Sequence, residues 1–166
     1  MQSLKFNQKM IGQASLWAAD IGRIKNSITK GRGNYAGRLG ELALAKHLGV
    51  EVEDSKDYDI IHDGKKIEVK TKRRAVAPQP DYTVNIAATS LHQKPDIYAF
   101  LSMEYLDRDS GGNYNDLLNI WLCGYKNAEQ FFEESSFWPK GTPDPPAFKT
   151  HRDMYVMKIK DLDNKL

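Results

Sequence analysis

The chain has 166 residues, which fits one domain, spanning 1–166, with a hydrophobic core of its own. Its hydrophobic content of 40% and charged content of 28% are ordinary for a soluble globular protein, and no apolar run approaches the ~20 residues of a membrane-spanning helix. The net charge of +2 does not by itself indicate a nucleic-acid binder, the single Cys123 excludes an intramolecular disulfide, and the polar N-terminus is unlike a secretory signal, so a cytoplasmic protein without membrane contact is expected.

Two helices are predicted in the first third of the chain. Residues 1–12 are expected to be irregular, and apolar residues at roughly helical spacing predict a first helix over 15–28. A glycine-containing break over 30–34 separates it from a second helix over 35–48, which has the stronger apolar periodicity and ends at Gly49.

A β-hairpin is the clearest feature of the middle of the chain. The segments 58–61 and 66–70 are strand-like, and the Asp63-Gly64 dipeptide between them is a favoured two-residue turn. A short strand is also predicted just upstream, over 50–52.

The remaining elements predict an α/β fold. Further strands are expected over 82–88, 97–103, 120–124 and 154–159, a short helix over 127–134, and loops over 75–80, 107–116 and 138–148. This order of helices and strands predicts one mixed central β-sheet flanked by helices on both sides.

The register of the hairpin brings three charged residues together. With Asp63-Gly64 as the turn, Asp59 faces Glu68 on the neighbouring strand, and Lys70 lies two residues further along the same face. Two facing carboxylates repel each other, and a divalent cation between them removes this conflict. Lys70 would then stand beside the metal, where it can orient a water or stabilise a charged transition state. A solvated strand face is the alternative interpretation, since such spacing also arises by chance.

Basic residues form two runs that flank these acids, one between Asp20 and Glu41 and one over 65–74. Either run alone is equally consistent with solvated surface, but two runs around one acidic constellation favour an anionic partner. By the alternation of a strand, Lys72 is the member expected to line the active-site side. The candidate nucleic-acid-binding residues are Arg32, Arg38, Lys72, Arg73 and Arg74. His92, in a polar segment between two strands, is interpreted as a surface or DNA-contacting residue.

The sequence also resembles a known superfamily. Tyr58-Asp59 followed by Glu68-Val69-Lys70 resembles the motif of the PD-(D/E)XK nucleases, which share the restriction-endonuclease-like fold. The segment 37–43 is similar to the helix that precedes the core hairpin in that family, and 97–101 to the strand that follows it. The resemblance covers residues 35 to about 125, and it departs from the motif at Tyr58, which stands in place of a proline.

The resemblance implies a restriction-endonuclease-like core and a set of site residues. Asp59 and Glu68 become metal ligands, joined by the backbone carbonyl of Val69, Lys70 becomes the catalytic lysine, and Glu41 becomes an assisting acid on the helix. The implied activity is Mg²⁺-dependent hydrolysis of phosphodiester bonds, with DNA as the expected substrate and Mn²⁺ able to substitute.

Two other functions stay open at this stage. In the first alternative the chain is a catalytically inactive nucleic-acid-binding member of the same superfamily. In the second it is a globular protein whose acidic hairpin binds a structural ion. The form of the nucleic acid is not predicted. Cleavage of both strands of a duplex would favour a symmetric homodimer.

Overall fold

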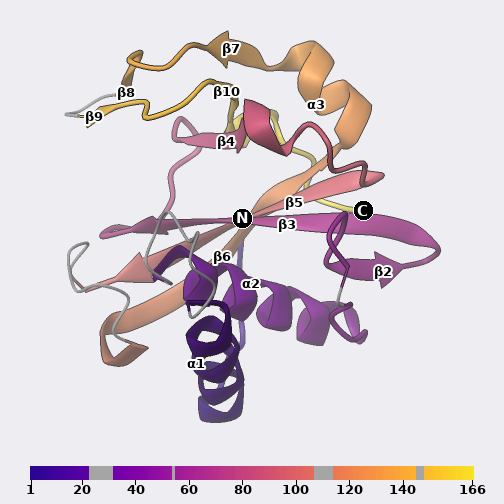
Figure 1. Ribbon diagram of the computed structural model, residues 1–166, viewed down its shortest axis with the longest axis vertical. Helices are drawn as coiled ribbons and strands as arrows, with labels where there is room; N and C mark the ends of the chain where they lie inside the picture. The colour runs from indigo at the N-terminus through magenta and orange to yellow at the C-terminus, as the bar shows by residue number, and fades with distance from the viewer. Residues whose placement is uncertain (23–31, 54, 107–113, 145–147) are drawn as a thin grey trace.

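A five-stranded mixed sheet forms the centre of the protein, as the computed structural model shows (Figure 1). The structure describes residues 1–22, 32–53, 55–106, 114–144 and 148–166. The sheet has the strand order β1-β6-β5-β3-β2, in which β3 and β5 run parallel and the other neighbours antiparallel. Its strands are β1 (Gln2–Leu4), β2 (Ile60–His62), β3 (Lys65–Arg74), β5 (Ile97–Tyr105) and β6 (Leu117–Asn127). The predicted α/β class with a mixed central sheet is therefore confirmed.

Different layers cover the two faces of this sheet (Figure 1). Helices α1 (Gln8–Gly22) and α2 (Arg32–Leu48) lie on one side. The other side carries helix α3 (Ala128–Glu134) and a small antiparallel sheet of the order β4-β10-β7. The small sheet consists of β4 (Thr83–Ala87), β7 (Ser136–Trp138) and β10 (Met154–Lys158). Helices were expected on both faces of the central sheet. They cover one face, whereas the other is covered largely by a second sheet together with α3.

The remaining elements are short. They are the pair β8 (Pro143–Asp144) and β9 (Phe148–Lys149), and the 3-10 turns η1 (Ala88–Ser90), η2 (Tyr114–Asp116) and η3 (Ile159–Asp161). The loop predicted over 138–148 was wrong at these short strands, which are too brief to show a periodicity. Most of the turn predicted over 107–116 lies outside the described residues. None of the described helices combines the length and apolar character of a membrane span.

The N-terminus differs most from its prediction. The expected irregular segment 1–12 contains strand β1, which pairs with β6 at the edge of the sheet, and the first residues of helix α1. The side chain of Asn7 accepts a hydrogen bond from the N–H of Met10 at 3.0 Å, so Asn7 caps the helix and fixes its start. The second helix begins at Arg32, three residues before the prediction, and residues 23–31 of the predicted first helix and break lie outside the described residues.

Strand β5 is buried on both faces and joins two hydrophobic cores. Ala99, Leu101 and Met103 face the core beneath the helices, whereas Tyr98 and Phe100 face the core beneath the small sheet and α3. This double burial explains the dense apolar run over 97–103, interrupted only by Ser102, which predicted a buried strand. Residues of β3 alternate in the same way, so Ile67 and Val69 face the helices, and Glu68 and Lys70 are directed toward the small sheet.

The turn of the predicted hairpin is confirmed. Asp63 and Gly64 have φ angles of 48° and 75°, and two positive φ angles are the requirement of a type I′ turn. The cross-strand pairs are His62 with Lys65, Ile61 with Lys66 and Ile60 with Ile67. The strand expected over 50–52 is reduced to a single bridge between Val52 and Ile60.

Helix α2 packs closely on β3 at Gly40. A Cβ atom there would collide with Oγ1 of Thr71 and lie 3.4 Å from its Cβ. We expect Gly40→Ala to lower the free energy of unfolding by about 1–2 kcal/mol, because overpacking outweighs the ~0.5–1 kcal/mol that alanine contributes in a helix. Gly12→Ala, in a part of α1 where a Cβ meets nothing within 4 Å, is the matched control and should be stabilising. Urea denaturation measures both, and a stabilising Gly40→Ala would contradict the close approach.

Candidate active site

Asp59 lies immediately before β2, at the edge of the central sheet. Its own N–H donates to the carbonyl of Ile67 at 2.9 Å, and its Oδ2 accepts a hydrogen bond from the N–H of Val69 at 2.7 Å. The ladder of β2 and β3 ends at the pair Ile60 and Ile67. The prediction that Asp59 belongs to the strand, directly paired with Glu68, was therefore wrong, because its carboxylate replaces a backbone acceptor for Val69.

Two further acids surround Asp59. The pKa of Asp59 is raised from 3.8 to about 8, first by burial and then by the charges of Glu41 and Glu68. The N–H of Val69 and the charge of Lys70 act in the opposite direction and lower it. Helix α2, the bend before β2, and strand β3 thus each contribute one carboxyl group to a common acidic cluster, which we define as Glu41, Asp59 and Glu68.

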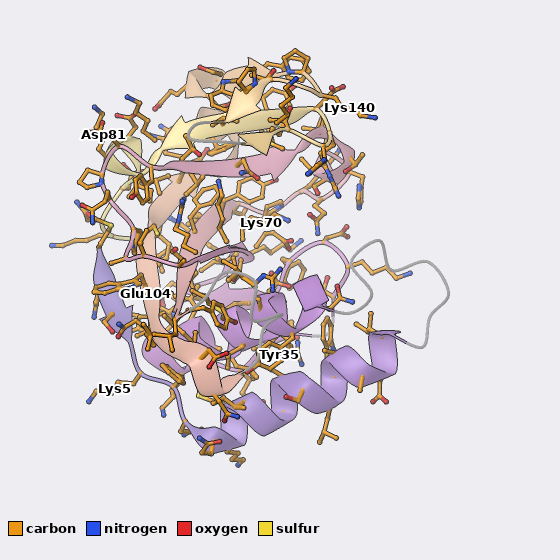
Figure 2. The ribbon with its side chains drawn as sticks, turned by 90° about the vertical axis from the view of Figure 1, so that its left-hand side faces the viewer. Lys5, Tyr35, Lys70, Asp81, Glu104 and Lys140 are labelled. Carbon is orange, nitrogen blue, oxygen red and sulfur yellow. The ribbon has the colours of Figure 1, made fainter. Side chains whose placement is uncertain are left out.

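Glu68 and Lys70 form an ion pair on the β3 face that is directed toward the small sheet. Lys70 Nζ lies 2.7 Å from Glu68 Oε1, and the Glu68 residue is only 6% exposed. Figure 2 shows Lys70 in the layer between helix α2 and the small sheet. Burial and the charge of Glu68 together raise the pKa of the neighbouring Tyr98 to about 12, so that this phenol stays protonated.

Gln93 completes the contacts of this ion pair and was missed by the sequence interpretation. Its Nε2 donates to Glu68 Oε1 at 2.9 Å and to the carbonyl of Lys56 at 3.2 Å, and its Oε1 accepts from Lys70 Nζ at 3.0 Å. It comes from the segment between η1 and β5, the same polar segment that contains His92. His92 is exposed, and its ring contacts the carbonyl of Thr89. Gln93 could not be identified from the sequence, because a single glutamine with no motif around it carries no signal.

Glu41 is the buried acid of helix α2. It is 8% exposed, and its Oε2 lies 3.0 Å from Nη1 of Arg38. The guanidinium of Arg38 also lies 5.1 Å from the ring centre of Trp17 on α1. One predicted nucleic-acid contact, Arg38, is therefore engaged within the protein by an acid of the cluster and by an aromatic ring.

The predicted nucleic-acid-binding residues on β3 lie on different faces of the strand and have different contacts. Arg74 donates to the carbonyl of Thr83 at 2.7 Å and its guanidinium lies 4.9 Å from the ring centre of Tyr82, so it fastens β3 to the small sheet. Lys72 shares the face of Lys70, as predicted, with its Nζ 3.4 Å from Thr83 Oγ1. Arg73 alternates to the opposite face, and the side chain of Arg32 lies outside the described part of the chain.

The acidic cluster offers carboxylates to a divalent cation, but Glu41 pairs with Arg38, Glu68 pairs with Lys70, and Asp59 accepts from the N–H of Val69. Burial is the main cause of the raised pKa of Asp59, and the charges of Glu41 and Glu68 raise it further, which is negative charge that a cation would neutralise. Among the described residues, however, no three potential ligand side chains are gathered as a complete metal cage. Mg²⁺ commonly takes one or two carboxylates plus waters, so Asp59 and Glu68 are the residues that would hold it, and Glu68 would have to turn from Lys70 and Gln93 to do so.

Comparisons with known proteins add no assignment. No family model, no curated protein and no solved structure matches the chain. The resemblance to the PD-(D/E)XK nucleases therefore rests on the residues themselves.

The raised pKa of Asp59 predicts a distinct dependence of stability on pH. In the absence of metal, the folded protein holds a proton on Asp59 that the unfolded chain releases above pH 3.8. The free energy of unfolding should therefore fall as the pH rises toward about 8, by up to ~1.4 kcal/mol per pH unit. Asp59→Asn keeps an acceptor for Val69 and should remove this slope.

Urea denaturation of the parent and Asp59→Asn in EDTA, between about pH 5 and 9, measures the difference. The variant should become the more stable of the two as the pH rises. Parallel curves for the two proteins would show that Asp59 has an ordinary pKa.

Proposed function

We propose that this protein is a Mg²⁺-dependent nuclease of the PD-(D/E)XK type, with a restriction-endonuclease-like core formed by α2, β2, β3 and β5. The observation that carries the proposal is the meeting of Glu41, Asp59 and Glu68 around one buried edge of the sheet, with Lys70 in direct contact with Glu68. Burial and the two neighbouring glutamates make ionisation of Asp59 costly, and a bound divalent cation would offset that cost.

Each residue has a role in this proposal. Asp59 and Glu68 would hold the ion, and Glu41 would assist from the helix. Val69 supports the assignment because its N–H faces Asp59, and the carbonyl of a strand residue points to the same edge as its N–H. When bound, Mg²⁺ supplies a positive charge that neutralises the phosphate and lowers the pKa of a water molecule. Lys70 would stabilise the charge that develops on the phosphate oxygens.

A panel of DNA substrates tests the proposal. The purified protein is incubated with supercoiled, linear duplex, single-stranded and branched DNA in Mg²⁺, in Mn²⁺ and in EDTA. Cleavage of at least one substrate in both metals and of none in EDTA is the expected result. Binding in Ca²⁺ without cleavage in any metal would instead support the catalytically inactive, nucleic-acid-binding alternative.

The basic residues provide a prediction about binding alone. Replacing the five candidates together should weaken DNA binding and lower the slope of log affinity against log salt by up to about 0.9 for each duplex phosphate that the variant no longer neutralises. The five are Arg32, Arg38, Lys72, Arg73 and Arg74. Arg38 and Arg74 make hydrogen bonds of 3.0 and 2.7 Å within the protein, whereas the contact of Lys72 with Thr83 Oγ1 is longer, at 3.4 Å. A second variant therefore replaces only Lys72 and Arg73.

Fluorescence anisotropy in Ca²⁺ over a range of salt concentrations provides the measurement. The matched control replaces Lys5 and Lys9, which are exposed near the N-terminus, and Figure 2 shows Lys5 far from Lys70. An unchanged salt slope in both the five-residue and the two-residue variants would mean that these cations are solvated surface.

A further inference from the structure

A cavity of about 230 Å³ opens directly beside Lys70, between the central sheet and the small sheet. The central sheet contributes residues of β3 and β5, and the small sheet contributes residues of β4 and the adjoining turn η1. Its lining includes Lys70, Lys72, Asn85, Ala87, Ser90 and Phe100. Lys70 therefore belongs both to the ion pair with Glu68 and to the wall of this cavity.

The spacing along β3 suits a nucleic-acid strand. Lys70 and Lys72 share one face of the strand and are separated by two residues, or about 6.6 Å along it. If the scissile phosphate lies at Lys70, the next nucleotide of the substrate lies beside Lys72. That nucleotide then lies over the cavity, and Lys72 is placed to contact its phosphate.

The lining of the cavity suits a nucleobase. Phe100, which is only 1% exposed, and Val84, which is 4% exposed, form an apolar floor beneath the polar lining of the cavity. Asn85 and Ser90 are half-buried and add polar groups. A carboxamide both donates and accepts hydrogen bonds, as the edge of a base requires, while the apolar surface receives the face of the ring.

The position of the cavity restricts the form of the substrate. It is a recess between two sheets, and its volume lies below the ~300–1,000 Å³ of pockets for drug-sized ligands, so one nucleotide fits better than a base pair. A base enters such a recess only when it is unstacked and unpaired. Resting on the proposed nuclease function, we propose that this cavity holds one unpaired nucleotide beside the scissile phosphate, so that the substrate is single-stranded or locally unpaired nucleic acid.

A cavity-filling variant tests the proposal. Ala87→Trp adds a large side chain to the lining at the end of β4, whereas Leu91→Trp, at a residue that is 46% exposed and outside the lining, is the matched control. Binding is measured in Ca²⁺ by anisotropy, with a fluorescein-labelled single strand and with the blunt duplex of the same sequence. The parent should prefer the single strand about tenfold, and Ala87→Trp should lose about that factor on the single strand alone.

The contradicting results are equally specific. Equal affinity of the parent for the two forms, or parental single-strand binding by a folded Ala87→Trp, would overturn the proposal. If circular dichroism shows that Ala87→Trp is unfolded, Asn85→Ala takes its place, with a severalfold loss of single-strand affinity expected and parental affinity as the overturning result. Binding is measured without cleavage, so the two proposals can fail separately. If the protein never cleaves DNA but prefers single strands, and the preference is lost when the cavity is filled, the nuclease proposal is refuted and the binding site is retained.

Discussion

Replacing Lys70 by Ala is expected to lower the rate of DNA cleavage by about 10³-fold while leaving DNA affinity within about twofold of the parent. Lys70 Nζ lies 2.7 Å from Glu68 Oε1 and places a positive charge directly beside one of the two proposed metal ligands. Its loss removes charge stabilisation at the reacting phosphate, whereas one cation among many contributes little to overall phosphate binding. Single-turnover cleavage in Mg²⁺ and anisotropy in Ca²⁺ measure the two effects separately.

The control for this variant is Lys65→Ala, which removes an exposed lysine at the beginning of the same strand and should cleave at the parental rate. A structural effect of Lys70 is separated from a chemical one by urea denaturation of both variants. Parental cleavage by Lys70→Ala would show that the family resemblance assigns the wrong role to this lysine, even if a metal binds nearby.

The second large effect concerns the metal ligands. Asp59→Asn and Glu68→Gln should each remove measurable Mg²⁺ binding in titration calorimetry and lower cleavage by about 10³-fold or more, because each takes away a negatively charged oxygen ligand. Both substitutions keep the size of the side chain, and the amide oxygen that Asp59→Asn introduces can still accept the hydrogen bond from Val69. The metal-free variants should therefore fold, and Asp59→Asn should be more stable than the parent at alkaline pH.

Asp81→Asn is the matched control for these variants. Asp81 is exposed and pairs with Lys158 and Lys160, and these contacts lower its pKa. Its replacement should leave Mg²⁺ affinity and cleavage unchanged. Mg²⁺ affinity at the parental level in both Asp59→Asn and Glu68→Gln would place the metal elsewhere or exclude it from the acidic cluster.

Local chemistry accounts for the parts of the fold that the sequence predicted well. Asp63-Gly64 adopts the two positive φ angles that its composition favours, and the register of the hairpin follows from this turn. The apolar run over 97–103 marks a strand buried on both faces. Glu68 and Lys70 share one face because side chains alternate along a strand. Their contact could therefore be predicted from the sequence.

Interactions between distant segments account for what was missed. Gln93 reaches Glu68 across 25 positions of the sequence, and no local pattern indicates such a contact. Asp59 leaves its strand because its carboxylate, rather than its backbone, bonds to Val69, a choice that propensity does not reveal. The small sheet joins β4 to β10 near the C-terminus, so the cavity beside Lys70 depends on a pairing between strands far apart in the sequence.

Single-turnover cleavage of labelled DNA in Mg²⁺ is the most direct test of whether the acidic cluster and Lys70 form a metal-dependent nuclease site. The parent and Asp59→Asn are purified by one procedure, so that any contaminating nuclease is present in both preparations. We predict cleavage by the parent that EDTA abolishes, and cleavage by Asp59→Asn that is slower by about 10³-fold or more. Equal rates in the two preparations, or no cleavage by either on every form of DNA, would contradict the claim.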